Sequence, residues 1–323
     1  MAKNIIITGP TATGKTKLAV FLAKRFNGEI ISADSRQVYR HLDIGTGKDI
    51  EEYGTGTNAV PYHLIDIVGP DAEYNLMRFR QDAPVAINDI HSRGHLPIIS
   101  GGTPLYIDSL ISDYKLDGGA SDKNLRTSLK KKEIPGLLEI LKENSLAEWE
   151  KLRENPNRNR IIRAIEKTIL PSIEDPVSLP ENTQWLIIGV FFHRKEVHKR
   201  IEARLNQRLE EGMVEEAEKL HSEYGLSWER MEFLGLEYRY LAYYLQNKMS
   251  YEEMHDKLLI KIRQFAKRQD IWFRKMEREG HTIHWIPEGE REEAAKLAEI
   301  FLNNSKLPEP KIKISDINYG NIR

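Results

Sequence analysis

The sequence predicts an α/β fold in which a parallel sheet is flanked by helices and a helical domain is inserted into this core. Three observations predict it: apolar β-branched runs alternate with helical patterns, a glycine-rich loop joins the first strand to the first helix, and a charged mid-chain stretch lacks strand signals. The 323 residues are enough for a core and an insertion. We expect the core at residues 1–114 and 183–306, the insertion at 115–182 and a loose tail at 307–323.

The first strand, loop and helix form one phosphate-binding motif. Residues 5–7 are three isoleucines, and residues 17–24 have helical apolar spacing. The loop between them fits G-x-x-x-x-G-K-[ST] at every fixed position: Gly9, Pro10, Thr11, Ala12, Thr13, Gly14, Lys15 and Thr16. Such a loop presents backbone N–H groups and a lysine to an anion, and its threonine hydroxyl can hold Mg²⁺. The core is therefore predicted to be P-loop NTPase-like and to bind a polyphosphate, which need not be ATP.

The second predicted strand, residues 29–34, ends in Asp34. Because parallel pairing places Asp34 at the carboxyl edge of the sheet, it is either a functional acid or a helix N-cap. Residues 62–68 predict a third strand, and residues 96–100 predict another that runs into a Gly-Gly-Thr turn at 101–103. This last strand ends without the aspartate that orders Mg²⁺ in a hydrolytic motor, which argues against that activity.

Two arginine clusters indicate contacts with anions. Arg160 and Arg163 lie three residues apart in the most basic stretch of the insertion, so they share a helical face. In a later helix, Arg200, Arg204 and Arg208 also share a face, and beside a phosphate loop they indicate a pyrophosphate clamp. A surface stripe that is paired to carboxylates would give the same pattern.

Residues 251–278 form a long basic helix or helix pair with interleaved aromatic residues, among them Phe265, Trp272 and Phe273. Basic side chains can follow a nucleic-acid backbone while aromatic rings stack on bases. The same aromatic residues would also suit a buried helix face. Since the net charge of the chain is −1, a nucleic-acid surface must be local.

The composition excludes several other classes of site. The absence of cysteine excludes disulfides, thiolate catalysis and cysteine-ligated metals. The sequence has no signal-peptide pattern, no repeat and no apolar run of membrane-spanning length. We therefore expect a cytoplasmic monomer without a membrane partner.

Separate stretches of the chain resemble the tRNA dimethylallyltransferases, also called tRNA isopentenyltransferases. Besides the phosphate loop, they are residues 34–40 with 43–46, 63–67, 101–106, 160–166, and 263–269 with 272–274. The Asp-Ser-x-Gln-Val-Tyr-Arg and Arg-Gln-x-Ala-Lys-Arg-Gln blocks are the most specific. All of these matches follow the order in which the family carries them.

The resemblance implies transfer of a dimethylallyl group from dimethylallyl diphosphate to N6 of adenosine at tRNA position 37, with release of pyrophosphate. Asp34 would be the general base, Thr103 would lie at the reaction centre, and Arg204 would help the phosphate loop hold the diphosphate. Mg²⁺ would bind through Thr16. The residues that would contact the tRNA anticodon stem-loop are Asp34, Ser35, Arg36, Gln37, Arg126, Asn159, Arg160, Ile161, Ile162, Arg163, Lys267 and Arg268.

The chain departs from the family pattern at Arg36, Pro104, Arg208 and Ile262, where Met, Gly, Met and Thr are common. These departures bear on the tRNA target and the level of activity more than on the reaction type. Three other functions stay open: an ATP-binding P-loop kinase of a small substrate, prenyl transfer to free AMP, and a tRNA-binding protein without catalysis. The basic helix argues against free AMP, and the intact site residues argue against a protein that has lost catalysis.

Overall fold

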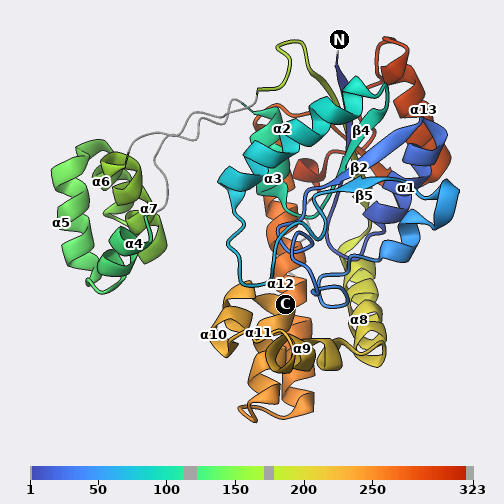
Figure 1. Cartoon of the computed structure of the whole chain (residues 1–323). Coiled ribbons are helices and arrows are strands. Elements are labelled where there is room, and N and C mark those ends of the chain that lie inside the picture. Colours follow the sequence, from blue (N-terminus) through green and yellow to red (C-terminus); the bar gives the residue numbers. More distant parts are fainter. Residues whose placement is uncertain (1, 113–121, 171–177, 318–323) are drawn as a thin grey trace. The chain divides into compact units, whose positions relative to one another are not determined.

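The computed structural model of the chain describes residues 2–112, 122–170 and 178–317 (Figure 1). The chain divides into two compact units. The core comprises residues 1–112 and 177–323, and the insertion comprises residues 113–176.

The strands of the core form one parallel sheet in the order β3-β2-β4-β1-β5-β6. They are β1 (Lys3–Thr8), β2 (Gly28–Ser32), β3 (Tyr62–His63), β4 (Leu96–Ser100), β5 (Gln184–Phe191) and β6 (Ile283–Pro287). In β1, Ile6 lies opposite Ile99 of β4 and Ile187 of β5. Because this central strand is covered on both faces, it is apolar on both. The predicted α/β fold with a P-loop-like parallel core is confirmed.

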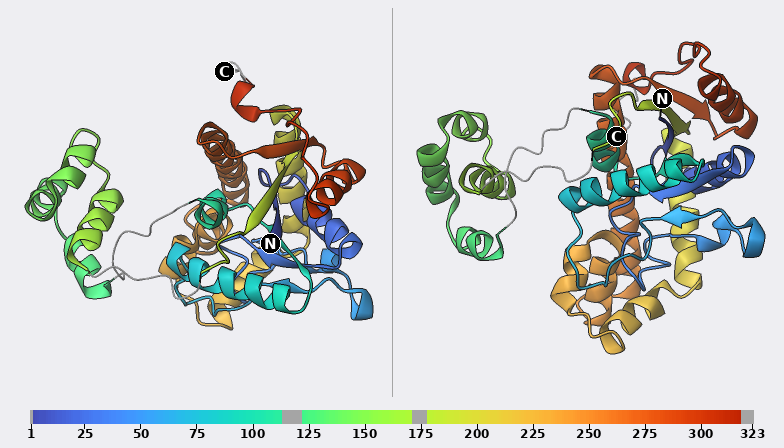
Figure 2. Two further views of the ribbon diagram at one scale, coloured as in Figure 1. Left: turned by 90° about the horizontal axis from the view of Figure 1, so that it is seen from above. Right: turned by 45° about the horizontal axis from the view of Figure 1, so that its top comes forward.

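Helices cover both faces of the sheet (Figures 1 and 2). Ile5 and Ile7 pack in a cluster with α1 (Lys15–Arg25) and α13 (Arg291–Leu302), whereas Ile6 packs in a second cluster. That second cluster includes α2 (Leu76–Ser92), α3 (Pro104–Ile111) and α12 (Tyr251–Arg278). The alternation of isoleucines in β1 therefore supplies one face to each layer, as the two-residue period of a strand requires.

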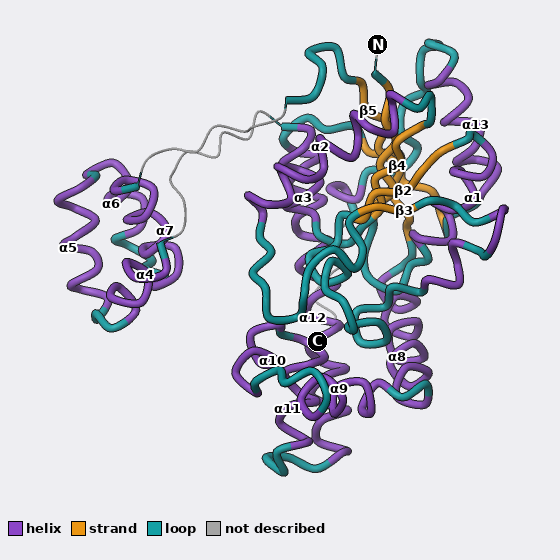
Figure 3. Tube along the Cα trace, in the orientation of Figure 1, coloured by secondary structure: helices purple, strands orange, loops and turns teal. Residues whose placement is uncertain are grey.

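Five helices follow β5 and form the helical end of the core (Figure 3): α8 (Arg194–Glu210), α9 (Met213–Ser222), α10 (Trp228–Leu234), α11 (Leu236–Leu245) and α12. The long α12 begins at a capping box in which Ser250 and Glu253 bond to each other's backbone N–H groups. Its apolar residues pack against α8, α11 and α3. None of the helices in the described residues is both long and apolar enough to span a bilayer.

The insertion contains four helices in its described residues: α4 (Lys123–Lys130), α5 (Ile134–Asn144), α6 (Leu146–Leu152) and α7 (Arg158–Ile169). They enclose a small apolar core of their own, with Leu137 and Leu141 of α5 against Ile161 and Ile165 of α7. The side-chain amide of Asn157 accepts the Arg160 N–H and caps α7.

Two expectations about the core are wrong. The third strand contains Tyr62 and His63 alone, because Leu64 and Asp66 have positive φ angles of 61° and 56°, which no strand accommodates. The tail is also not loose over residues 307–317. Ile314 is buried, and Glu277 of α12 accepts hydrogen bonds from the N–H groups of Ile314 (3.2 Å) and Ser315 (2.7 Å).

Candidate functional site

The phosphate loop lies between β1 and α1 at the carboxyl edge of the sheet. Gly9 has a φ of 144°, and a Cβ there would lie 2.8 Å from the Val190 carbonyl oxygen, so no side chain fits. Gly14 is the N-cap of α1 in the left-handed conformation. The loop therefore wraps around the start of α1, where the helix N–H groups and dipole favour an anion.

Lys15 bends back over the loop, where its Nζ donates to the Pro10 carbonyl oxygen at 2.7 Å. Burial and, to a smaller extent, the positive charge of Arg204 lower the pKa of Lys15 to about 7, while the negative charge of Asp34 opposes the shift. The lysine is thus desolvated and close to both Arg204 and Asp34. A diphosphate in the loop would restore its charged form.

Asp34 does not cap a helix, so the N-cap alternative is wrong. Its Oδ1 accepts the Arg36 N–H at 2.9 Å in a tight turn after β2. Thr103 lies beside this turn, because its Oγ1 accepts the Ser35 N–H at 3.1 Å. A Cβ built on Gly102 would lie 3.7 Å from Asp34 Oδ2 and 3.9 Å from Lys15 Cε. The acid and the phosphate-binding lysine therefore face the same point of the backbone.

Gln269 of α12 joins the two loops that carry these groups. Its Oε1 accepts the Thr11 N–H at 2.9 Å, its Nε2 donates to the Gly102 carbonyl oxygen, and its side chain is 2% exposed. From the sequence, Gln269 was not expected at the site. The available signal was a glutamine on the apolar face of an otherwise basic helix.

The arginines of α8 line the other side of the phosphate loop. Arg200 Nε donates to the Ala12 carbonyl oxygen at 2.8 Å, while Arg204 and Arg208 lie 3.4 and 3.8 Å from the carboxylate of Asp49. Arg204 and Arg208 line a small cavity together with Glu237. The other lining residues are Thr11, Ala12, Ile201, Leu205, Met213 and Ile262. The three arginines that the sequence placed on one face thus lie beside the phosphate loop.

Arg208 is an unusual member of this group. Burial lowers its pKa to about 10, with the charge of Arg204 as the second cause. Its Nη2 is buried and has no hydrogen-bond partner among the described residues. Its ion pair with Asp49, at 3.8 Å, is too long to be a hydrogen bond, so a buried donor of Arg208 stays unused beside the phosphate loop.

The loop from 43 to 48 is fixed from both sides. Glu216 of α9 accepts the N–H groups of Asp43, Ile44 and Gly45 at 2.8, 2.7 and 3.0 Å. Lys48 is 1% exposed and pairs with Asp43. Gly47 has a positive φ of 62°, and a Cβ there would displace the terminal Nη2 atoms of Arg204 and Arg208. The Gly47 carbonyl oxygen accepts a hydrogen bond from Gln37 Nε2 at 2.9 Å.

The residues predicted to contact RNA differ in exposure. Lys267 and Arg268 are exposed on α12, and Asn159 and Arg160 are exposed on α7. Arg126 instead donates two hydrogen bonds of 2.7 Å to the buried carboxylate of Glu166, and Arg163 lies 3.4 Å from the same carboxylate. The side chains of Ile161 and Ile162 are buried in the insertion core, and that of Phe273 in α12 is fully buried. These three side chains pack the protein and present no surface.

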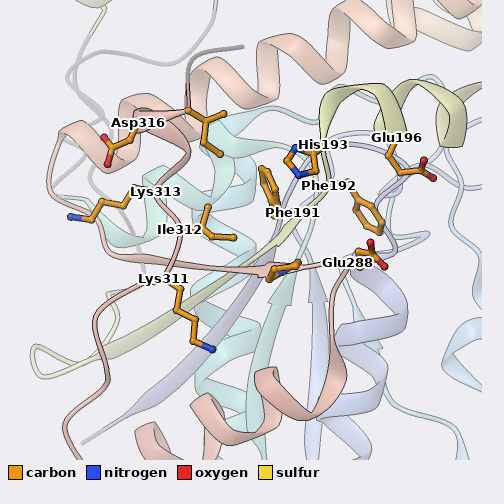
Figure 4. A pocket seen from close by; sticks show the side chains of 11 residues that line it. Phe191, Phe192, His193, Glu196, Glu288, Lys311, Ile312, Lys313 and Asp316 are labelled. Carbon is orange, nitrogen blue, oxygen red and sulfur yellow. The ribbon is translucent and has the colours of Figure 1, made fainter. Parts of the chain in front are cut away.

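A cavity of about 590 Å³ lies elsewhere in the core, between the ends of β5 and β6 and residues 311–317 (Figure 4). Phe191, His193 and Ile312 are among its lining residues. None of the residues assigned to the site from the sequence lines it. The candidate site is therefore the phosphate loop with Asp34 and the α8 arginines. No group of three or more His, Cys, Asp or Glu side chains in the described residues is arranged to hold a metal ion.

Comparisons with known proteins relate the sequence to one family. The sequence model described as IPP transferase matches residues 37–276, and one described as isopentenyl transferase matches residues 2–63. The chain is 45% identical over 304 residues to tRNA dimethylallyltransferase 1 of Syntrophus aciditrophicus, with 92% of this chain and 97% of that protein covered. It is 47% identical over 289 residues to tRNA dimethylallyltransferase 2 of Treponema denticola, covering 88% and 95%.

Solved structures give the same result. The full-length tRNA isopentenylpyrophosphate transferase of Bacillus halodurans matches with a TM-score of 0.66 and 32% identity over 94% of this chain and 96% of that one. A eukaryotic dimethylallyltransferase acting on tRNA shares the fold, with a TM-score of 0.76 and 24% identity over 96% of this chain and 81% of that one. With a family match over most of its length and relatives at more than 40% identity, the chain belongs to the IPP transferase family.

Proposed function

We propose that the protein transfers a dimethylallyl group from dimethylallyl diphosphate to N6 of adenosine at position 37 of tRNA, giving N6-isopentenyladenosine and pyrophosphate. The observation that carries the proposal is the meeting of Asp34 and Lys15 at Gly102, because it puts an acid that can accept a proton next to a site for a diphosphate. The names of the relatives point to the same reaction.

The phosphate loop holds the leaving group in this proposal. The backbone N–H groups of residues 12–16, the Lys15 ammonium and the Arg204 guanidinium bind the diphosphate, whose negative charge grows as the C1–O bond of the donor breaks. The Thr16 hydroxyl has no hydrogen bond within the described residues, so it is available to a metal that also binds phosphate oxygens. When bound, Mg²⁺ would neutralise charge on the departing pyrophosphate.

Asp34 acts on the acceptor. The adenine N6 attacks C1 of the donor, the N6–C1 bond forms as C1–O breaks, and the N6 proton passes to the free Oδ2 of Asp34. Hydrogen bonds from the Arg36 N–H to Oδ1 and from the Ser35 N–H to Thr103 hold this turn in place. Thr103 therefore lies where it can contact the reacting amine.

The RNA would be held by exposed basic side chains. We assign the anticodon stem-loop to Ser35, Arg36 and Gln37 near the site, to Lys267 and Arg268 on α12, and to Asn159 and Arg160 on α7. Arg126 and Arg163 would neutralise Glu166 and hold α7, while Ile161 and Ile162 would fix the same helix from inside the insertion. We place the reaction in the cytoplasm, with the protein acting as a monomer.

Prenyl transfer is tested with radiolabelled dimethylallyl diphosphate and unmodified tRNA that has adenosine at position 37. The controls are the same tRNA with guanosine there, and free AMP. Label in the adenosine tRNA alone is the expected result. Label in AMP would make the protein a free-nucleotide transferase, and ATP turnover on a small molecule without any label would make it a kinase; neither alternative is supported by the relatives.

A further inference from the structure

An exposed aromatic ring lies on the short helix α10, beside the candidate site. Phe233 is 60% exposed, the largest exposed fraction among the large apolar side chains of the described residues. A single exposed apolar residue needs no explanation by itself. Phe233 differs from such residues because its ring is held: the Arg230 guanidinium lies 5.0 Å from the ring centroid.

Arg230 attaches this ring to the core. Its guanidinium also lies 5.5 Å from the ring centroid of Tyr39, which is 1% exposed. Its N–H groups donate to the carbonyl oxygens of Pro70, at 2.9 Å, and Ala72. Because the arginine is stacked between a buried ring and an exposed one and is fixed by backbone hydrogen bonds, Phe233 presents a preorganised apolar face to solvent.

The turn between α10 and α11 brings this face to the site. Gly235 follows Phe233 by two residues, and a Cβ there would lie 3.9 Å from Nη2 of Arg36. Arg36 in turn donates its backbone N–H to Asp34. The Arg36 guanidinium has no hydrogen bond or ion pair within the described residues. The turn that follows the exposed ring therefore lies beside a guanidinium that has no hydrogen bond or ion pair in the described part of the chain, on the Asp34 side of the core.

We propose that Phe233 is a stacking platform for an unpaired RNA base next to the target adenosine, and that Arg36 binds a neighbouring phosphate. The proposal rests on the proposed function. An adenine that leaves the anticodon-loop stack to reach Asp34 removes a stacking partner from its neighbours. An aromatic ring replaces that partner without reading sequence, and a guanidinium beside it contacts the backbone between two nucleotides.

The test compares Phe233→Ala and Phe233→Trp with Tyr251→Ala, a matched truncation of another exposed aromatic residue at the start of α12. The RNA is an anticodon stem-loop with adenosine at 37 and 2-aminopurine at 36 or 38. Phe233→Ala should raise the KM for RNA by about 5- to 150-fold and abolish quenching of one 2-aminopurine on binding. It should not change the KM for dimethylallyl diphosphate. It should also not change the salt slope, which is the slope of the logarithm of RNA affinity against the logarithm of salt concentration. Phe233→Trp and Tyr251→Ala should match the wild type.

Two results overturn this inference. One is a Phe233→Ala variant with wild-type KM for RNA and wild-type quenching. The other is a variant with a lower Tm and a raised KM for both substrates, which would make the ring a structural element. The proposed function fails separately, if the wild type labels no adenosine-37 RNA at all. Arg36→Gln should lower the salt slope by about one phosphate contact, and an unchanged slope would remove Arg36 from the proposal.

Discussion

The lowered pKa of Lys15 gives a direct prediction about donor binding. With a pKa of about 7, about half of the free enzyme has a charged Lys15 at pH 7, about a tenth at pH 8 and about a hundredth at pH 9. The diphosphate binds the charged form, so binding above pH 7 requires uptake of a proton from solvent. Because terminal phosphates lose their last proton near pH 6, the donor itself does not change above pH 7. The kcat/KM for dimethylallyl diphosphate should therefore fall about fivefold from pH 7 to 8 and about tenfold from pH 8 to 9.

The assay is kcat/KM for the donor from pH 6 to 9, with saturating RNA and constant ionic strength. Calorimetry of an unreactive thiolo analogue of the donor, in two buffers with different ionisation enthalpies, counts the protons taken up on binding. Arg204→Met removes the second cause of the lowered Lys15 pKa. It should therefore weaken donor binding and also shift the fall of kcat/KM to higher pH. A flat profile with no proton uptake would refute the reasoning, since it would mean that Lys15 stays charged in the free enzyme.

Further expectations concern other parts of the site. Asp34→Asn should lower kcat by about 10²–10⁴-fold while RNA binding stays within about threefold, and lost binding with normal turnover would contradict its role as base. Lys267→Glu with Arg268→Glu should weaken RNA binding and lower the salt slope by about two; an unchanged slope would remove α12 from the RNA surface. Gln269→Leu leaves the N–H of Thr11 and the carbonyl of Gly102 without their partner, so unfolding free energy should fall by about 1–3 kcal/mol for each group, as measured by urea denaturation. Arg208→Met should raise the dissociation constant for the donor analogue about tenfold, because the buried Nη2 of Arg208 has no hydrogen bond within the described residues and only a long ion pair with Asp49, at 3.8 Å; unchanged affinity would count against an anion in that cavity.

Local patterns were enough to predict the phosphate loop and the place of Asp34, because the strand–loop–helix order and parallel pairing determine where these residues lie. The third strand was predicted to be too long, because the apolar run continues to residue 68. The strand ends before Leu64 and Asp66, whose positive φ angles cannot be recognised from an apolar pattern. Gln269 was missed because its partners are distant in sequence: Thr11 lies 258 residues away and Gly102 lies 167. The position of Gln269 on the apolar face of α12 indicates a buried partner but does not identify it.

The sequence also did not show which of the basic side chains are exposed and which form ion pairs within the protein. Arg163 lies in the basic stretch of the insertion, and the family resemblance assigned Arg126 to RNA. Glu166, which lies 40 residues from Arg126, nevertheless forms ion pairs with both. Burial of Ile161 and Ile162 follows from the apolar face of α7, which the motif match did not consider. Family motifs thus locate a surface without separating the residues that make it from those that support it.

The amide of Gln269 has a thermodynamic consequence. One rigid group bonds at the same time to the loop that would receive the donor and to the loop that carries the acceptor side of the site. If the phosphate loop moves when the donor binds, the Gln269 amide must either lose one of these hydrogen bonds or move Gly102 with the loop. The free energies of binding the two substrates are then linked, and the linkage is reciprocal: whatever factor the donor contributes to RNA affinity, RNA contributes to donor affinity.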